Sequence, residues 1–369
     1  MSTLTEILSG EITTASELVY LLSLADPGDI ELLREKAYEV MAENVGEKVY
    51  LRGLVEYSNI CACDCLYCGI RRSNRKVKRY VLDKNEIIDA AKWAAEQGFG
   101  SIVIQGGERS DARAVEFVAD VVCDIKKVTK SDELPEGLGI TLSIGELEKS
   151  QYEELYSAGA HRYLLRIETT NRELFHKIHP WGQDFDKRLK CLELLRETGY
   201  QVGTGIMIGL PWQGYEDLAN DLMFFRDFNI DMIGMGPYLP HEDTPLSIFK
   251  EAWNDQRDRI YRDSLKMIAV TRIFLKDVNM ASTTALQTID KDGRKNGLLY
   301  GANIIMPQMT PIRVRGDYLL YNNKPCLDHE AVENKKAIEK EILSAGRQPG
   351  YNQWGDSRHF KLRAGHNAL

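Results

Sequence analysis

Two hydrophobic periods alternate along this chain. Short apolar runs, each followed by polar or Gly/Pro-rich residues, predict strands, and the stretches between them carry apolar residues at helical spacing. The predicted strands cover residues 48–56, 101–105, 139–143, 163–167, 201–208, 232–236, 280–285 and 302–306. The predicted helices between them cover 83–97, 112–127, 146–158, 185–196, 215–228 and 255–275. Repeated strand–helix alternation of this kind predicts a parallel sheet.

The number of units favours a closed sheet. About eight strand–helix units close into an α/β (β/α)8 TIM-type barrel, whose active site lies at the C-terminal ends of its strands. An open doubly wound sheet is the alternative, but it usually has a glycine-rich phosphate turn after its first strand. Here Tyr57-Ser58-Asn59 and a group of cysteines follow that strand. We therefore expect a barrel over residues 46–325, an N-terminal helical extension over 1–45, and a C-terminal helix (328–345) with an irregular tail within 326–369.

The composition narrows the classes of partner. The chain has 369 residues and a net charge of −8, which argues against nucleic acid as the main partner. Residues 1–24 contain no Lys or Arg, and their apolar run over 18–24 is too short to span a membrane. We therefore expect a cytoplasmic protein without a membrane partner. Thiols stay reduced there, so seven cysteines with dense local spacing favour metal binding over disulfides.

Three of the cysteines have the spacing of iron–sulfur ligands. Cys61, Cys65 and Cys68 supply three thiolates from one short loop, enough for three irons of a [4Fe–4S] cluster with the fourth iron open. Zinc is the alternative, but structural zinc needs four ligands, usually in two separated pairs. Cys63 would complete four only if every second residue of 61–65 pointed at one ion. The spacing therefore favours the cluster and leaves Cys63 as a spare thiol.

The segment from Asn59 to Gly69 resembles the radical S-adenosylmethionine (SAM) signature, with an aromatic residue before the last cysteine. The resemblance implies that SAM binds the open iron and is reductively cleaved to methionine and a 5′-deoxyadenosyl radical. Residues 105–108 resemble the GGE motif, whose backbone receives the SAM amino group, and 205–211 resemble an element near adenine. Taken alone, these are a strand-end turn and a buried strand. The cofactor residues implied are Tyr67, at the adenine, with Gly106, Gly107 and Gly209.

Longer blocks resemble HydE, the SAM enzyme family that matures [FeFe]-hydrogenase. They cover residues 65–74, 163–171, 231–237, 240–245, 282–285 and 303–307, and the match runs from about residue 30 to 325. Biotin synthase and methylornithine synthase are relatives with fewer matching blocks. The resemblance implies a HydE-like role in assembling the hydrogenase active-site cluster. The alternatives are a radical SAM enzyme on an amino-acid-like substrate, a HydE-like protein of other function, and a non-catalytic iron–sulfur or zinc scaffold.

The HydE resemblance also implies residue roles. Glu168 would hold the SAM ribose hydroxyls, and Arg188 would pair with the SAM carboxylate, although its helical position also fits a solvated face. Arg166 lies two residues before Glu168, so on a strand both face the same side, and it would bind an anionic substrate. Arg166 and Tyr318 are the catalytic candidates. The substrate cavity would be lined by Thr141, Ser143, Thr283, Thr284 and Met306.

The same resemblance implies the partners. These are a small organometallic or amino-acid-like substrate, an electron donor such as a ferredoxin or flavodoxin, and other hydrogenase maturases. Some HydE proteins carry three further cysteines for a second cluster. Here Cys326 stands alone and Asn334 and Ala337 occupy the matching positions, so we expect one cluster per chain. The basic run 71–79 fits a solvated loop, or one that docks the electron donor or shields the cluster.

Overall fold

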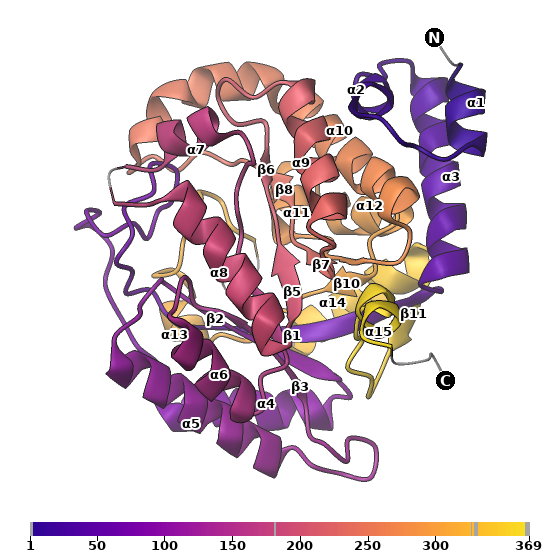
Figure 1. Cartoon of the computed structure of the whole chain (residues 1–369). Helices are drawn as coiled ribbons and strands as arrows, with labels where there is room; N and C mark the ends of the chain where they lie inside the picture. Colours follow the sequence, from indigo (N-terminus) through magenta and orange to yellow (C-terminus); the bar gives the residue numbers. More distant parts are fainter. Residues whose placement is uncertain (1–2, 181, 326, 328–330, 366–369) are drawn as a thin grey trace.

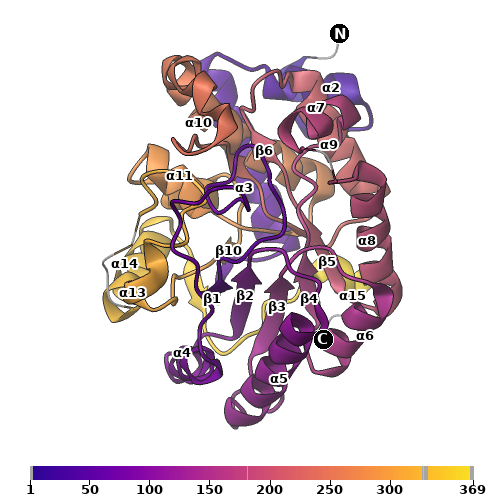
Figure 2. The same ribbon diagram turned by 90° about the vertical axis from the view of Figure 1, so that its left-hand side faces the viewer.

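The computed structural model describes residues 3–180, 182–325, 327 and 331–365. The parallel strands lie side by side in one sheet (Figure 2). A bridge between Ala281 and Ile304 joins the first and last strands of this sheet and closes it into a ring. The ring strands are β1 (Lys48–Ser58), β2 (Ser101–Gly106), β3 (Gly139–Ser143), β4 (Arg162–Leu164), β5 (Gln201–Thr204), β7 (Met232–Ile233), β9 (Asn279–Met280) and β10 (Ile304–Ile305). This arrangement confirms the expected (β/α)8 barrel.

Helices cover the outside of the barrel, each burying one apolar face against the strands. α5 buries Val115, Val118, Val122 and Ile125 at the three- and four-residue spacing of a helix face. The helices after the first strand are α4 (Lys84–Glu96), α5 (Ala112–Val128), α6 (Lys149–Ser157), α7 (Arg172–Ile178), α8 (Phe185–Thr198), α9 (Tyr215–Asp227), η1 (Pro245–Phe249), α10 (Lys250–Leu275), α11 (Thr284–Ile289), α12 (Gly293–Leu299) and α13 (Ile312–Arg315). The expected helix over 255–275 therefore begins five residues earlier.

Several strands are shorter than the apolar runs suggested. β4 ends at Leu164, and the expected strand 201–208 divides into β5 and β6 (Met207–Ile208). The run 232–236 likewise divides into β7 and β8 (Gly236–Pro237), which pairs with β6. The expected strand 280–285 is wrong beyond Ala281, which makes the last bridge, because α11 begins at Thr284. A hydrophobic run indicates burial and not hydrogen bonding. At the mouth of this barrel the chain stays buried after the hydrogen bonds between the strands of the sheet have ended.

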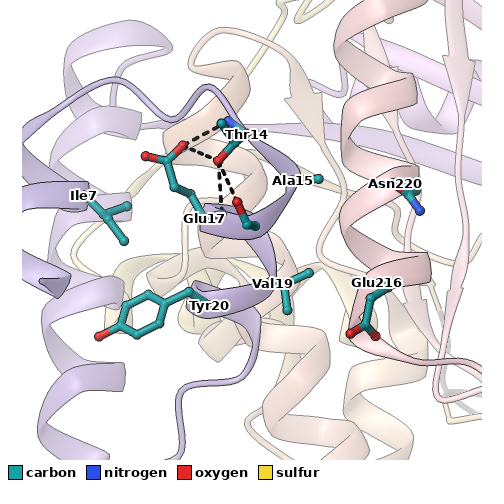
Figure 3. A pocket seen from close by; sticks show the side chains of 9 residues that line it. Ile7, Thr14, Ala15, Glu17, Val19, Tyr20, Glu216 and Asn220 are labelled. Carbon is teal, nitrogen blue, oxygen red and sulfur yellow. Dashed lines mark hydrogen bonds between the residues drawn. The ribbon is translucent and has the colours of Figure 1, made fainter. Parts of the chain in front are cut away.

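The N-terminal extension is helical, as expected. It consists of α1 (Leu4–Ser9), α2 (Ala15–Leu22) and α3 (Pro27–Asn44), with α2 against α9 and α3 against α10 (Figure 1). A surface cavity of about 790 Å³ lies between α1, α2 and α9, lined by Ile7, Val19 and Tyr20 among others (Figure 3). None of the predicted site residues lines it. No helix in the described part of the chain has the length and apolar character needed to cross a membrane.

The C-terminal segment departs most from the sequence interpretation. α14 (Ala331–Ser344) agrees with the predicted helix, but the expectation of an irregular tail is wrong. β11 (Gln348–Gly350) pairs in parallel with the start of β1, and α15 (Arg358–Arg363) follows. Between them the chain crosses the N-terminal end of the barrel, where the Gly355 carbonyl accepts hydrogen bonds from Arg52 and Asn279. The sequence Gln-Pro-Gly has no strand pattern of its own. It is a strand here because it pairs with the free edge at the start of β1.

Candidate active site

The three cysteines lie on the loop that follows β1, at the C-terminal end of the barrel (Figure 1, purple). Arg79 holds this loop in shape. Its guanidinium donates hydrogen bonds to the carbonyls of Asn59 at 2.6 Å, Ile70 at 2.7 Å and Arg71 at 2.6 Å. These carbonyls flank Cys61 and Cys68, so one half-buried cation fixes both ends of the loop.

The turn after β2 packs directly against the cysteine loop. The Glu108 amide donates to Cys61 Sγ at 3.4 Å, and the Ala62 amide donates to the Glu108 carbonyl at 2.9 Å. A Cβ on Gly107 would lie 2.4 Å from the Ile60 carbonyl oxygen, and one on Gly106 2.4 Å from the Tyr57 ring. Side chains at these two positions would therefore separate the turn from the loop. The glycines named from sequence lie where close backbone approach requires them.

The thiols on this loop are a donor set that an iron–sulfur cluster can use. Cys61, Cys65 and Cys68 are free thiols on one short loop. The Cys63 thiol interacts with those of Cys61 and Cys65, which raises the pKa of Cys63 and lowers the pKa of the other two. Three thiolates from one loop suit three irons of a cubane.

Tyr67 points into this site rather than into the barrel wall. Its hydroxyl lies 3.1 Å from His179 Nε2, and His179 Nδ1 lies 2.9 Å from the Phe175 carbonyl oxygen. Burial, together with the nearby charges of Cys65 and Glu168, raises the pKa of Tyr67. A neutral hydroxyl that donates to His179 satisfies both groups. Sequence reasoning missed His179, because only the fold brings α7 beside the cysteine loop.

Arg166 and Glu168 form an ion pair at the barrel mouth. Arg166 Nε donates to Glu168 Oε1 at 3.0 Å, and Arg166 Nη2 donates to Oε2 at 2.9 Å and to the Ile206 carbonyl at 2.7 Å. The expectation that both residues lie on one strand and face the same side is wrong, since β4 ends at Leu164. Glu168 instead has a φ of 67°, a left-handed conformation that turns its carboxylate back.

The loop after Glu168 is fixed from α9. Buried Asp221 accepts hydrogen bonds from the Thr170 amide and hydroxyl, both at 2.6 Å. Burial raises the pKa of Asp221 to about 7. Asn171 also donates to Asp217 at 2.7 Å. These contacts stabilise the strained backbone that presents the Glu168 carboxylate.

Arg188 is buried beside Glu108 and Glu146, so the alternative of a solvated helix face is wrong. Its side chain is 9% exposed, and its Nε donates to Glu146 Oε1 at 2.7 Å. Nη1 donates to the Arg166 carbonyl at 3.0 Å, and Nη2 lies 3.4 Å from Glu108 Oε2. Burial opposes the charged form, but Glu108 and Glu146 raise the pKa of Arg188 above its usual value. Both glutamates escaped sequence analysis, although Glu108 lies within the GGE match.

Gly209 lies one turn beyond the mouth, with a φ of 82° that glycine tolerates. Its amide donates to Gln213 Oε1 at 2.8 Å, and a Cβ there would lie 2.7 Å from Ile260. Gly209 and Ile208 thus lie between the mouth and α10. At this position Gly209 can present its backbone, and not a side chain, to a ligand.

The predicted substrate-cavity residues lie deeper, in the barrel interior. Thr141 and Met306 line a cavity of about 40 Å³, and Thr284 and Met306 line one of about 10 Å³. Thr141 also accepts a hydrogen bond from Arg162 Nε at 3.0 Å, so its hydroxyl is engaged within the barrel wall. The buried Thr283 hydroxyl has no hydrogen-bond partner in the described part of the chain. Ser143 ends β3 and is half-buried.

Tyr318 is buried on the loop after α13, beside Gln105 of β2. Its hydroxyl accepts a hydrogen bond from Gln105 Nε2 at 3.2 Å, and burial raises its pKa well above the usual range. The Lys324 ammonium lies 5.3 Å from the ring centroid and 2.5 Å from Glu56 Oε1. Sequence analysis named neither Glu56 nor Lys324. Cys326, named for the second cluster, lies outside the described residues.

Four similarities to known proteins concern this chain. Residues 55–225 match the family model of the radical SAM superfamily. The chain is 40% identical over 340 residues to the [FeFe] hydrogenase maturase subunit HydE of Thermotoga maritima, covering 92% of this chain and 93% of the relative. It is 29% identical over 305 residues to the 3-methylornithine synthase of Methanosarcina acetivorans, covering 81% of each. The structure of methylornithine synthase (PylB) superposes with a TM-score of 0.78 at 25% identity, covering 98% of this chain and 99% of that one.

Proposed function

Because this chain belongs to the HydE family of the radical SAM superfamily, we propose that it cleaves SAM reductively and serves in assembling the [FeFe]-hydrogenase active-site cluster. One observation carries the proposal. The loop of Cys61, Cys65 and Cys68 is held against the Gly107 turn at the open end of a closed barrel, with Glu108 N–H on Cys61 Sγ. Thiolates, backbone donors and a buried Arg–Glu network thus meet where barrel enzymes place their chemistry.

The family implies a [4Fe–4S] cluster and SAM as cofactors. We assign Cys61, Cys65 and Cys68 as the ligands of a single cluster per chain. When bound, the two cofactors supply one-electron reduction and the 5′-deoxyadenosyl radical. Arg188, Ile178 and Met207 are buried beside the half-buried Tyr67, so this part of the site is partly shielded from water.

Different residues of the chain would bind different parts of the SAM molecule. The Gly106–Gly107 backbone is available to the amino group, and Arg188 to the carboxylate by a charge-assisted hydrogen bond. Glu168 would accept from the ribose hydroxyls, and Tyr67 and Gly209 would border the adenine. Arg166 donates hydrogen bonds to Glu168 from two nitrogens and so orients its carboxylate. Arg188 would therefore act at the carboxylate of SAM, and Arg166 would act, through Glu168, at the ribose.

The substrate would enter the barrel below SAM. Arg166 and Tyr318 are the catalytic candidates there, with Thr141, Ser143, Thr283, Thr284 and Met306 lining the interior. Arg166 is paired with Glu168 but is 30% exposed, and a guanidinium that a ligand can reach suits an anionic organometallic substrate or an amino-acid-like one. A low-potential electron carrier and other hydrogenase maturases would be its protein partners in the cytoplasm.

Two assays test the proposal in sequence. Anaerobic reconstitution should load about four irons per chain, and a chemical reductant with SAM should then release 5′-deoxyadenosine. Addition to the other maturases should activate apo-hydrogenase. About eight irons would contradict the single cluster. SAM cleavage without hydrogenase activation would instead favour an amino-acid-like substrate, the alternative supported by the TM-score of 0.78 to methylornithine synthase.

A further inference from the structure

An exposed tryptophan lies in a strained turn near the barrel mouth. Trp212 is 53% exposed and has a φ of 70°, in a turn closed by the Gln213 amide on the Leu210 carbonyl at 3.2 Å. With Pro211 before it, this is the turn position that glycine or asparagine normally fills. A tryptophan here strains the backbone and leaves about half of its surface in water. Folding alone does not account for it.

The indole belongs to an apolar patch built from three separate segments. Its ring lies edge-on to Phe249 with centroids 5.0 Å apart, and the Lys177 ammonium lies 5.6 Å from the indole centroid. Ile248, beside Phe249, is 79% exposed. We call Trp212, Phe249, Ile248 and Lys177 the Trp212 patch. Exposed aromatic and aliphatic side chains beside a cation are typical of a protein-binding surface.

The Trp212 patch borders the cysteine loop directly. The Leu66 amide donates to the Ile178 carbonyl at 2.9 Å, and the Leu246 amide donates to the Leu66 carbonyl at 3.1 Å. Leu66 lies between Cys65 and Cys68, so the ends of α7 and η1 hold the loop between them. Those two elements carry Lys177 and Ile248. A protein seated on the patch would therefore contact the loop that holds the proposed cluster.

The segment that follows the cysteine loop is strongly basic. Residues 69–82 contain six Lys or Arg and no carboxylate, in a chain of net charge −8. Arg79 and Arg71 serve the loop itself, and Lys76 pairs with Asp243. Three further cations, Arg72, Arg75 and Lys78, are exposed and have no ion pair among the described residues. The Arg72 amide donates to the Cys63 carbonyl at 2.8 Å, so this basic loop also rests on the cysteine loop.

We propose that the Trp212 patch and the exposed cations Arg72, Arg75 and Lys78 together form the docking surface for an acidic one-electron carrier protein. The inference rests on the proposed function, which needs one electron from outside for each SAM cleaved. The carrier is oxidised by one electron and the cluster is reduced by it. Cations steer an acidic carrier towards the loop, and an aromatic anchor fixes the short-lived complex. Such encounters typically bury less than about 1,200 Å².

The test uses the reconstituted full-length enzyme and an acidic ferredoxin or flavodoxin as the probe. Two variants are compared with wild type: Trp212→Gly, which relieves the backbone strain, and the combined Arg72→Glu, Arg75→Glu and Lys78→Glu. Leu343→Ala on α14 and Lys127→Glu on α5, exposed side chains on other elements, serve as matched controls. The readouts are the carrier dissociation constant and the rate of SAM cleavage, with the carrier or with dithionite as reductant.

Each docking variant should weaken carrier binding by about tenfold or more and slow carrier-driven cleavage, while dithionite-driven cleavage stays within about twofold of wild type. Raising the salt concentration should weaken carrier binding to wild type more than to the charge-reversed variant. Unchanged carrier affinity overturns the proposal, as does an equal loss with dithionite. A Trp212-dependent dimer with normal carrier binding would assign the patch to a second copy and also overturn it. Absence of dithionite-driven cleavage in wild type would instead refute the proposed function.

Discussion

β4 and the residues after it place an arginine at each end of the barrel, and the two arginines do different things. Arg162, at the N-terminal end, is fully buried and donates to Ser101, to Thr141, to the Trp354 carbonyl and to Asp356. Arg166, at the C-terminal end, pairs with Glu168, and its side chain is 30% exposed. The first is saturated by its own chain. The second lies where a ligand can reach it.

The difference arises from what covers each end. The tail after β11 lies across the N-terminal end, and the Gly355 carbonyl and Asp356 bond to side chains of β1, β4 and β9. At the C-terminal end the cysteine loop covers only one side, and the Trp212 patch remains exposed. Buried ion pairs are therefore not evidence of function by themselves. Closure by the chain separates structural charges from functional ones.

The largest expected effect is at the open end. Cys68→Ser should abolish cluster loading and SAM cleavage, because two thiolates cannot hold the three irons that need protein ligands. Cys63→Ser is the matched control and should keep the iron content and the cleavage rate. Iron and sulfide analysis with 5′-deoxyadenosine detection measures both. Loss of iron in Cys63→Ser would show that the spare thiol is a ligand.

At the closed end, Arg162→Ala should lower the free energy of unfolding by about 3–5 kcal/mol, because it leaves Asp356 half-enclosed without its cation. Urea denaturation of the apo-protein measures this change. The double variant Arg162→Ala/Asp356→Ala should lose less than the sum of the two single variants. Additive losses would show that the pair does not couple the tail to β4.

The closed end should also respond to pH. Burial, with Arg162 beside it, lowers the pKa of His161 to about 4, against an ordinary value near 6.5. The folded state then favours the neutral ring, so this stabilisation is complete above pH 6.5 and is lost as pH falls towards 4, by up to about 3 kcal/mol. His161→Gln should remove this part of the pH dependence of unfolding. His176→Gln, exposed on α7, should leave it unchanged.

The smallest stability effect belongs to Arg166. Arg166→Ala should change the free energy of unfolding by less than about 1 kcal/mol, because its pair is partly exposed. SAM binding should persist, since Glu168 keeps its backbone bonds to Gly205 and Met207. Hydrogenase activation should fall by about tenfold or more. Calorimetric SAM titration and a maturation assay measure the two outcomes, and normal activation by this variant would remove Arg166 from the substrate role.

How far the sequence predicts this molecule depends on the range of the interactions. The cysteine loop and the Gly106–Gly107 turn were predictable because their spacing is local and their chemistry is restrictive. The barrel was predictable from its repeated periods. The partners of Arg188 were not, because Glu146 and Glu108 lie 42 and 80 residues away, and helical periodicity places Arg188 on the buried face of α8 without naming its partners. β11 was not, because Gln348-Pro349-Gly350 has no strand pattern.

The sequence by itself determined the kind of chemistry: three thiolates at fixed spacing, glycines for close backbone approach, and a repeat that closes into a barrel. Only the tertiary structure decided which charged side chains are paired within the fold and which a ligand can reach. Arg162 and Arg166 are four residues apart and look alike in sequence. Their roles separate because the tail seals one end of the barrel with Asp356, whereas the other end stays open beside the cysteine loop. Hydrophobic period and motif spacing are local properties, whereas the partner of a charge depends on which distant segments the closed ring brings together.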